Sequence, residues 1–89
     1  MSTVEMTSEL IRAARALLRW DQQDLAKASE VSLPTIKRLE AKPGALNAHK
    51  PTVSALRRAL ETNGIEFTNG ETPGVRLHRE RKPPNNPRT

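Results

Sequence analysis

The stretch that decides the fold is QQDLAKASEVSLPTIKRLEA, residues 22–41, and its pattern predicts two short helices joined by a tight turn. Asp21 precedes the first helix and is placed to cap it, because its carboxylate can accept hydrogen bonds from the free amides of the first turn. Asp24 lies at the position that completes a capping box. Ser32 is placed to cap the second helix, which tolerates Pro34 because first-turn amides have no partner within the helix.

The apolar residues of this stretch should pack the two helices against each other. The expected inward positions are Leu25, Ala26, Val31, Ile36 and Leu39. Together with Gln22 and Glu40, their spacing resembles the helix-turn-helix of the phage lambda-type repressors, the Xre (Cro/CI-like) family, over roughly residues 8–63. Glu30 departs from the family pattern, since Gly is usual at this turn, and a left-handed backbone at a non-Gly residue costs about 1 kcal/mol.

Length and composition favour one small domain and exclude several kinds of chemistry. The chain has 89 residues and no cysteine, which excludes disulfides and thiolate metal sites. A core of this size is marginal unless a partner subunit adds to it. No apolar run approaches the roughly 20 residues that a membrane span needs, and the N-terminus lacks a signal-peptide pattern, so a cytoplasmic protein is expected.

Positive charge is concentrated from the second helix of this stretch onward. The net charge is +5, and residues 32–58 carry six basic side chains and one acidic side chain, Glu40. The basic residues are Lys37, Arg38, Lys42, Lys50, Arg57 and Arg58. This concentration is typical of a surface that contacts phosphates, and the alternative is a merely solvated basic face.

A first helix is expected before this stretch, capped by residue 7 or 8 and running to about residue 19. Its apolar face is formed by Leu10, Ile11, Ala14, Leu17 and Leu18. Arg12, Arg15 and Arg19 are expected on a solvated face, with phosphate contact as the alternative for Arg12 and Arg19. Trp20 is expected to pack in the core.

A further helix and a hairpin are expected after residue 41. Pro43 and Gly44 should end the second helix of the stretch, and Thr52 should cap the next helix, which ends at residues 63–64. Residues 65–68 and 75–77 alternate apolar and polar side chains around a turn sequence, which predicts a β-hairpin. Because a lone hairpin is marginal in water, it should either lay its apolar residues on the helices or pair an edge with a second chain.

These elements define the expected architecture. The fold class is mainly α, with a four-helix lambda-repressor-like helix-turn-helix domain over residues 7–63, and a flexible N-terminus over residues 1–6 precedes it. A short β-hairpin over residues 64–78 follows as a candidate dimerisation element, and residues 79–89 form a disordered basic tail.

The resemblance implies that the helix over residues 32–42 enters the major groove of DNA. The candidates for contacts to base edges are Leu33, Pro34, Thr35, Lys37 and Arg38. The candidates for contacts to phosphates are Gln22, Ser32, Lys42, Asn47, His49, Lys50 and Thr52. Arg38 is the expected bidentate partner of a guanine, which is worth about 1–3 kcal/mol of discrimination. Alternatively, Leu33 and Pro34 only pack and start the helix, and Lys37 pairs with Glu40 or Glu30.

The resemblance also implies the class of function. An enzyme is not expected, because the sequence has no Gly-rich phosphate loop after a strand, no nucleophile motif and no paired carboxylates at a defined spacing. His49 and His78 are lone histidines, so no metal and no cofactor are expected, and no small-molecule ligand is evident. A sequence-specific transcriptional regulator is expected, binding double-stranded DNA at a palindromic operator as a homodimer. The alternatives are a protein-binding module on the same fold (an antitoxin or an antiactivator) and a DNA-binding recombination accessory factor.

Overall fold

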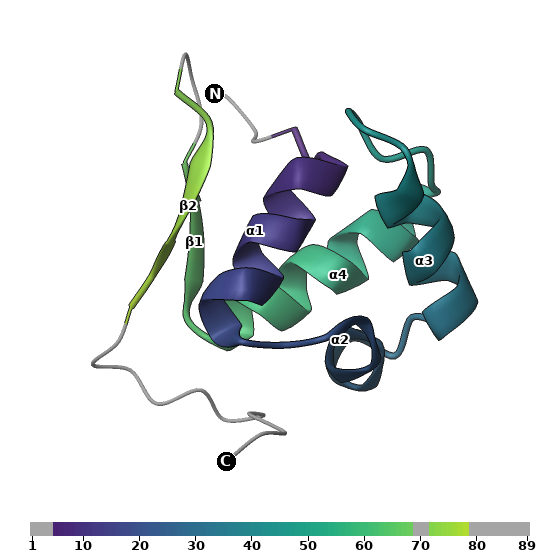
Figure 1. The fold of residues 1–89 in the computed structure, drawn as a ribbon, viewed down its shortest axis with the longest axis horizontal. Coiled ribbons are helices and arrows are strands. Elements are labelled where there is room, and N and C mark those ends of the chain that lie inside the picture. Colours follow the sequence, from purple (N-terminus) through teal and green to yellow (C-terminus); the bar gives the residue numbers. More distant parts are fainter. Residues whose placement is uncertain (1–4, 69–71, 79–89) are drawn as a thin grey trace.

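A computed structural model describes residues 5–68 and 72–78 of the chain. Within these residues four helices are followed by a two-stranded antiparallel hairpin (Figure 1). The elements are α1 (Ser8–Leu18), α2 (Gln22–Ser29), α3 (Leu33–Ala41), α4 (Lys50–Thr62), β1 (Ile65–Thr68) and β2 (Gly74–Leu77). The expected mainly helical fold with a hairpin after the helices is therefore confirmed. The basic tail over residues 79–89 and most of the flexible N-terminus fall outside the described residues, whereas Met6, also expected to be flexible, is buried.

The caps of the first three helices follow from local hydrogen bonding. The Thr7 side chain accepts from the Leu10 amide at 3.1 Å and so caps α1. Asp21 and Asp24 form a reciprocal capping box at the start of α2, with distances of 2.8 and 3.0 Å between each carboxylate and the other residue's amide nitrogen. The Ser32 hydroxyl oxygen accepts from the third amide of α3 at 3.3 Å. All three caps match the sequence-based prediction.

The turn between α2 and α3 contains a left-handed backbone, and the start of α4 has no side-chain cap. Glu30 adopts the expected left-handed conformation, with φ of 64°. The prediction that Thr52 caps α4 is wrong, because α4 begins at Lys50 and its cap is His49, which uses no side-chain hydrogen bond. Pro51 lies within the first turn, where its missing N–H has no intrahelical partner to lose, so the helix extends past it toward the N-terminus.

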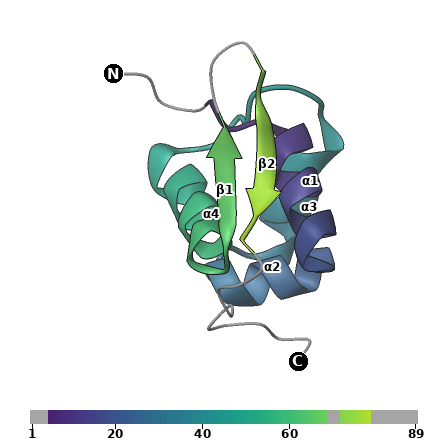
Figure 2. The same ribbon diagram turned by 90° about the vertical axis from the view of Figure 1, so that its left-hand side faces the viewer.

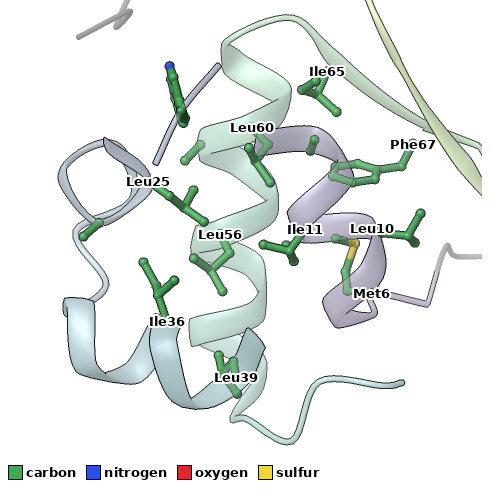
Figure 3. Close-up of a cluster of buried hydrophobic side chains, with 14 residues drawn as sticks. Met6, Leu10, Ile11, Leu25, Ile36, Leu39, Leu56, Leu60, Ile65 and Phe67 are labelled. Atoms are coloured by element: carbon green, nitrogen blue, oxygen red, sulfur yellow. The ribbon is translucent and has the colours of Figure 1, made fainter. Parts of the chain in front are cut away.

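One hydrophobic core joins the four helices and the hairpin. Figure 3 shows its labelled side chains, which come from the four helices, from β1 and from the residue before Thr7: Met6, Leu10, Ile11, Leu25, Ile36, Leu39, Leu56, Leu60, Ile65 and Phe67. Trp20 is buried as expected, and Val31 is half-buried against the same cluster. Leu17 does not join the apolar face of α1 as expected, because its position in the last turn leaves it 40% exposed.

The hairpin lies over α1 and α4, with β2 beside α1 and β1 beside α4 (Figure 2). Its register pairs Ile65 with Leu77 and Phe67 with Val75, so these four apolar side chains share one face of the sheet. Residues 65 and 67 are buried, and residues 75 and 77 are half-buried against the core. The hairpin therefore lays its apolar residues on the helices, which was one of its two expected arrangements.

The opposite face of the hairpin is polar. Arg76 donates to Glu66 at 2.7 Å, and the Nε2 atom of His78 lies 2.7 Å from the other oxygen of the same carboxylate. The hydrogen bonds from Arg76 and His78 hold the pKa of Glu66 below its ordinary value. In the part of the chain that is described, no helix is long and apolar enough to span a membrane.

Candidate nucleic-acid interface

Helix α3 lies at the edge of the molecule, at the opposite end of the longest axis from the hairpin (Figure 1). Its buried side chains are Ile36, Leu39 and Glu40, which are spaced three and four apart and so face inward together. The same periodicity turns Lys37 and Arg38 outward, and both are exposed. The sequence of α3 therefore produces an inner face that packs and an outer face that carries two cations.

The carboxylate of Glu40 is held inside the protein by three donors. The side chain of Arg15 donates to it through Nε at 2.8 Å and Nη2 at 2.6 Å, and Gln22 donates through Nε2 at 3.0 Å. Arg15 also donates through Nη1 to the backbone carbonyl of Trp20 at 3.0 Å. This network ties α1, α2 and α3 together, because each helix supplies one of the three side chains.

The network corrects one expectation and modifies another. Arg15 was expected on a solvated face with Arg12 and Arg19, but its side chain is only 17% exposed because α3 brings Glu40 against α1. Gln22 was expected to contact a phosphate, and its amide nitrogen instead donates to a buried carboxylate. Sequence reasoning missed this network. The signal for it in the sequence was that residues 32–58 contain six basic residues and a single acidic residue, Glu40.

Burial of Glu40 determines the charge of the surface around α3. No other acidic residue occurs between positions 32 and 58, and the charge of Glu40 is neutralised internally by Arg15. Among the described residues, no ion pair involves Lys37, Arg38, Lys42, Lys50 or Arg58. Arg57 is different, since it pairs with Glu61 at 2.8 Å and lies over the ring of Phe67. Residues 32–58 thus present unpaired cations and no exposed carboxylate.

A polar hollow of about 520 Å³ lies between α3 and the segment that leads into α4. Its lining residues are Thr35, Arg38, Asn47, Ala48, His49 and Thr52. Five of these six are residues that the sequence singles out. Two candidate base-contacting side chains on α3 therefore face three candidate phosphate-contacting side chains across one open space.

The remaining candidates do not line this hollow and differ in exposure. Pro34 and Lys42 are exposed at the first turn and the C-cap of α3, and Lys50 is exposed at the first residue of α4. Leu33 is half-buried against the core, which favours its packing role over a contact to a base. The hydroxyl of Ser32 caps α3 and also donates to the Thr35 hydroxyl at 2.9 Å.

The sequence left open whether Lys37 pairs with Glu40 or with Glu30, and the ion pairs of the structure bear on both alternatives. Lys37 does not pair with Glu40, because Arg15 occupies that carboxylate, and within the described ranges no ion pair joins Lys37 to Glu30 either. No group of His, Cys, Asp and Glu side chains among the described residues could hold a metal ion.

Comparison with protein-family models and with curated proteins finds no match to this chain. The functional interpretation therefore depends on the residues and the geometry of this surface.

Proposed function

We propose that this protein is a sequence-specific double-stranded DNA-binding transcriptional regulator with a lambda-repressor-like helix-turn-helix. The observation that carries the proposal is the charge of residues 32–58, where five cations have no ion-pair partner in the described part of the chain and the single carboxylate, that of Glu40, is buried. Burial of the one acidic group of this segment favours a polyanionic partner, because it lowers the repulsion against phosphates.

The shape of the molecule supports binding in the major groove. Helices α2 and α3 are joined by a turn over residues 30–32, and α3 is the outer of the two. In a helix-turn-helix the second helix enters the major groove while the first crosses the backbone. Thr35, Lys37 and Arg38 would then read base edges, and Arg38 suits the paired acceptors of guanine because its guanidinium presents two parallel donors.

The side chains on the other wall of the hollow suit the DNA backbone. Asn47, His49 and Thr52 supply side-chain donors, and Lys42 at the end of α3 and Lys50 at the start of α4 supply charges. Contacts to phosphates fix the register of a protein on the duplex and carry no sequence information themselves. Ser32 would contribute at the N-terminus of α3, where the first-turn amides favour an anion, whereas the carboxylates of Asp21 and Asp24 at the start of α2 disfavour a phosphate beside Gln22.

Two copies of the chain on a palindromic operator complete the proposal. A single α3 can contact only a few base pairs, and a dimer of symmetrically placed helices doubles the length of sequence that is read. The class of regulator implied by the resemblance of residues 22–41, the Xre family, is consistent with this arrangement.

The test is to select bound sequences from a random pool of duplexes and then to measure the affinity of variants for the selected site and for random duplex. We expect Arg38→Ala to lose most of the preference for the selected site, by about 5- to 150-fold, because one bidentate contact to a base is lost. The fold should be unaffected, since the Arg38 side chain is exposed and makes no ion pair in the described residues.

Arg76→Ala is the matched control, because it removes the same charge from the outer face of the hairpin at the far end of the molecule. It should keep the preference for the selected site. Failure to enrich any sequence with the wild-type protein would contradict the proposed function, and unchanged discrimination in Arg38→Ala would show that Arg38 is not the reader.

A further inference from the structure

The segment between α3 and α4 is fastened to the start of α1 by backbone hydrogen bonds. Thr7 and Ala45 form an isolated antiparallel bridge. On either side of it, the Ser8 amide donates to the carbonyl of Gly44 at 2.9 Å, and the Leu46 amide donates to the carbonyl of Met6 at 3.2 Å. Residues 44–46 are thus held by a part of the chain that is remote in sequence.

A side chain of α1 completes this attachment. Glu9 lies in the first turn of α1, and its Oε1 atom accepts from the Gly44 amide at 3.1 Å. Gly44 has φ of +93°, a conformation that suits glycine, and its N–H and C=O groups both bond to residues at the start of α1. The backbone N–H groups of Glu9 and Gly44 hold the pKa of the Glu9 carboxyl below its ordinary value, so the group stays ionised and remains an acceptor.

The fastened segment continues directly into one wall of the polar hollow. Asn47, Ala48 and His49 follow it and face Thr35 and Arg38 of α3 across the open space. His49 caps α4 without a side-chain hydrogen bond, so nothing in its own cap fixes this wall relative to α3. The attachment of residues 44–46 to α1 and the packing of Leu46 and Ala48 against the core therefore set the position of the wall.

We propose that Glu9 is a positioning residue for the interface around α3. Its carboxylate holds Gly44 in place, and Gly44 in turn holds the wall formed by residues 47–49. This fixes the distance between the wall and Arg38, so that one duplex can contact the wall and Arg38 together. Glu9 itself makes no contact with the nucleic acid. The hydrogen bonds of Glu9 and Gly44 support a role for Glu9 in holding the wall in place. The effect of that role on DNA binding rests on the proposed function.

Three variants isolate this role. Glu9→Gln keeps an acceptor oxygen and loses the charge, Glu9→Ala loses both, and Glu5→Ala removes one acidic charge from an exposed residue nearby that makes no hydrogen bond in the described ranges. Because all three variants lose one negative charge, differences between them report on the hydrogen bond. The probe is a short duplex of random sequence, whose binding depends on the phosphate contacts.

Glu9→Ala should bind this duplex about three- to tenfold more weakly than either Glu9→Gln or Glu5→Ala, which is the effect of one net hydrogen bond. Amide hydrogen exchange gives a readout that does not need DNA. Exchange at Gly44 and Leu46 should be faster in Glu9→Ala than in Glu9→Gln, whereas exchange at Leu60 in the core should be the same in both.

Equal affinity and equal exchange in Glu9→Ala and Glu9→Gln would overturn the inference. Faster exchange at Gly44 with no change in affinity would also overturn it, since the attachment would then not matter to the interface. If no variant, including the wild type, binds the duplex, the proposed function fails, and the role of Glu9 in positioning an interface to DNA is withdrawn with it.

Discussion

Glu40 carries the only negative charge between residues 32 and 58, and its side chain is 5% exposed. A carboxylate buried to this extent is tolerated only when its lone pairs are satisfied, and here Arg15 and Gln22 supply three hydrogen bonds to it. One pairing therefore serves two purposes. It joins three helices, and it removes the acidic group from the surface that is proposed to meet DNA.

Arg15→Met tests the structural purpose of this pairing. Methionine keeps the apolar stem but leaves Glu40 buried without its cation, and breaking a buried pair in this way costs about 3–5 kcal/mol. The free energy of unfolding, measured by urea denaturation, should fall by that amount.

Arg12→Met is the control, because Arg12 lies on the exposed side of the same helix and should change stability by less than about 0.5 kcal/mol. The double variant Arg15→Met with Glu40→Leu should recover most of the loss, since no buried charge is then left unpaired. Equal stability of the two arginine variants would mean that the pair makes no net contribution.

At the scale of the helices and strands, the cap hydrogen bonds of α2 and α3 were predictable, and the side-chain contacts between residues distant in the sequence were not. Asp21, Asp24 and Ser32 bond to amides within three residues, so their caps could be predicted from spacing alone. The contacts that shape the interface span much longer separations. Arg15 and Glu40 are 25 residues apart, and Glu9 and Gly44 are 35 residues apart. No periodicity in the sequence relates such pairs, because they meet only when α1 packs beside α3.

The sequence indicated several residues of the candidate site but not the orientation of their side chains. Twelve candidates were selected from charge and from the family resemblance, and five of them line the hollow together. Leu33 turned toward the core and Gln22 toward Glu40, because each lies at the start of a helix where the direction of the side chain depends on the neighbouring helix. Sequence spacing gives the face of a helix but not which element covers it.

The turn from α4 into β1 can be tested by substitution of its glycine. Gly64 has φ of +102°, and a Cβ atom added there would lie 3.2 Å from the Leu77 side chain and 3.4 Å from the carbonyl of His78. Gly64→Ala should therefore lower the free energy of unfolding on the order of 1–3 kcal/mol, from backbone strain and from displacement of β2.

Gly44→Ala provides the comparison, because Gly44 also has a positive φ but a Cβ atom there would have nothing within 4 Å. It should show the backbone strain alone, about 1 kcal/mol. Thermal or urea unfolding of both variants measures the difference. A Gly44→Ala variant as unstable as Gly64→Ala would show that the packing of β2 against this turn contributes little.

For the whole molecule, the placement of the hairpin limits how a dimer can bind DNA. The hairpin and α3 lie at opposite ends of the longest axis, which measures 31 Å (Figures 1 and 2). Two chains joined face to face through the outer faces of their hairpins would place the two copies of α3 at opposite ends of an assembly twice that length. Half-sites on one face of DNA lie about 34–36 Å apart, one helical turn. A dimer joined face to face in this way would therefore connect separate duplexes rather than bind one palindrome, whereas pairing through a strand edge would place the second chain beside the first.

We expect the proposed dimer to form on adjacent half-sites without using the outer face of the hairpin. Selected sequences should then contain inverted repeats whose centres are about one helical turn apart. Arg76→Asp reverses a charge on the exposed outer face of the hairpin and should leave two chains bound per duplex when the complex is measured by sedimentation. A complex in which this variant lowers the stoichiometry to one chain, or a wild-type protein that links two duplexes, would instead make the hairpin the interface. In that case the cationic surfaces around α3 would act independently, and the affinity for a palindrome would not exceed that for a single half-site.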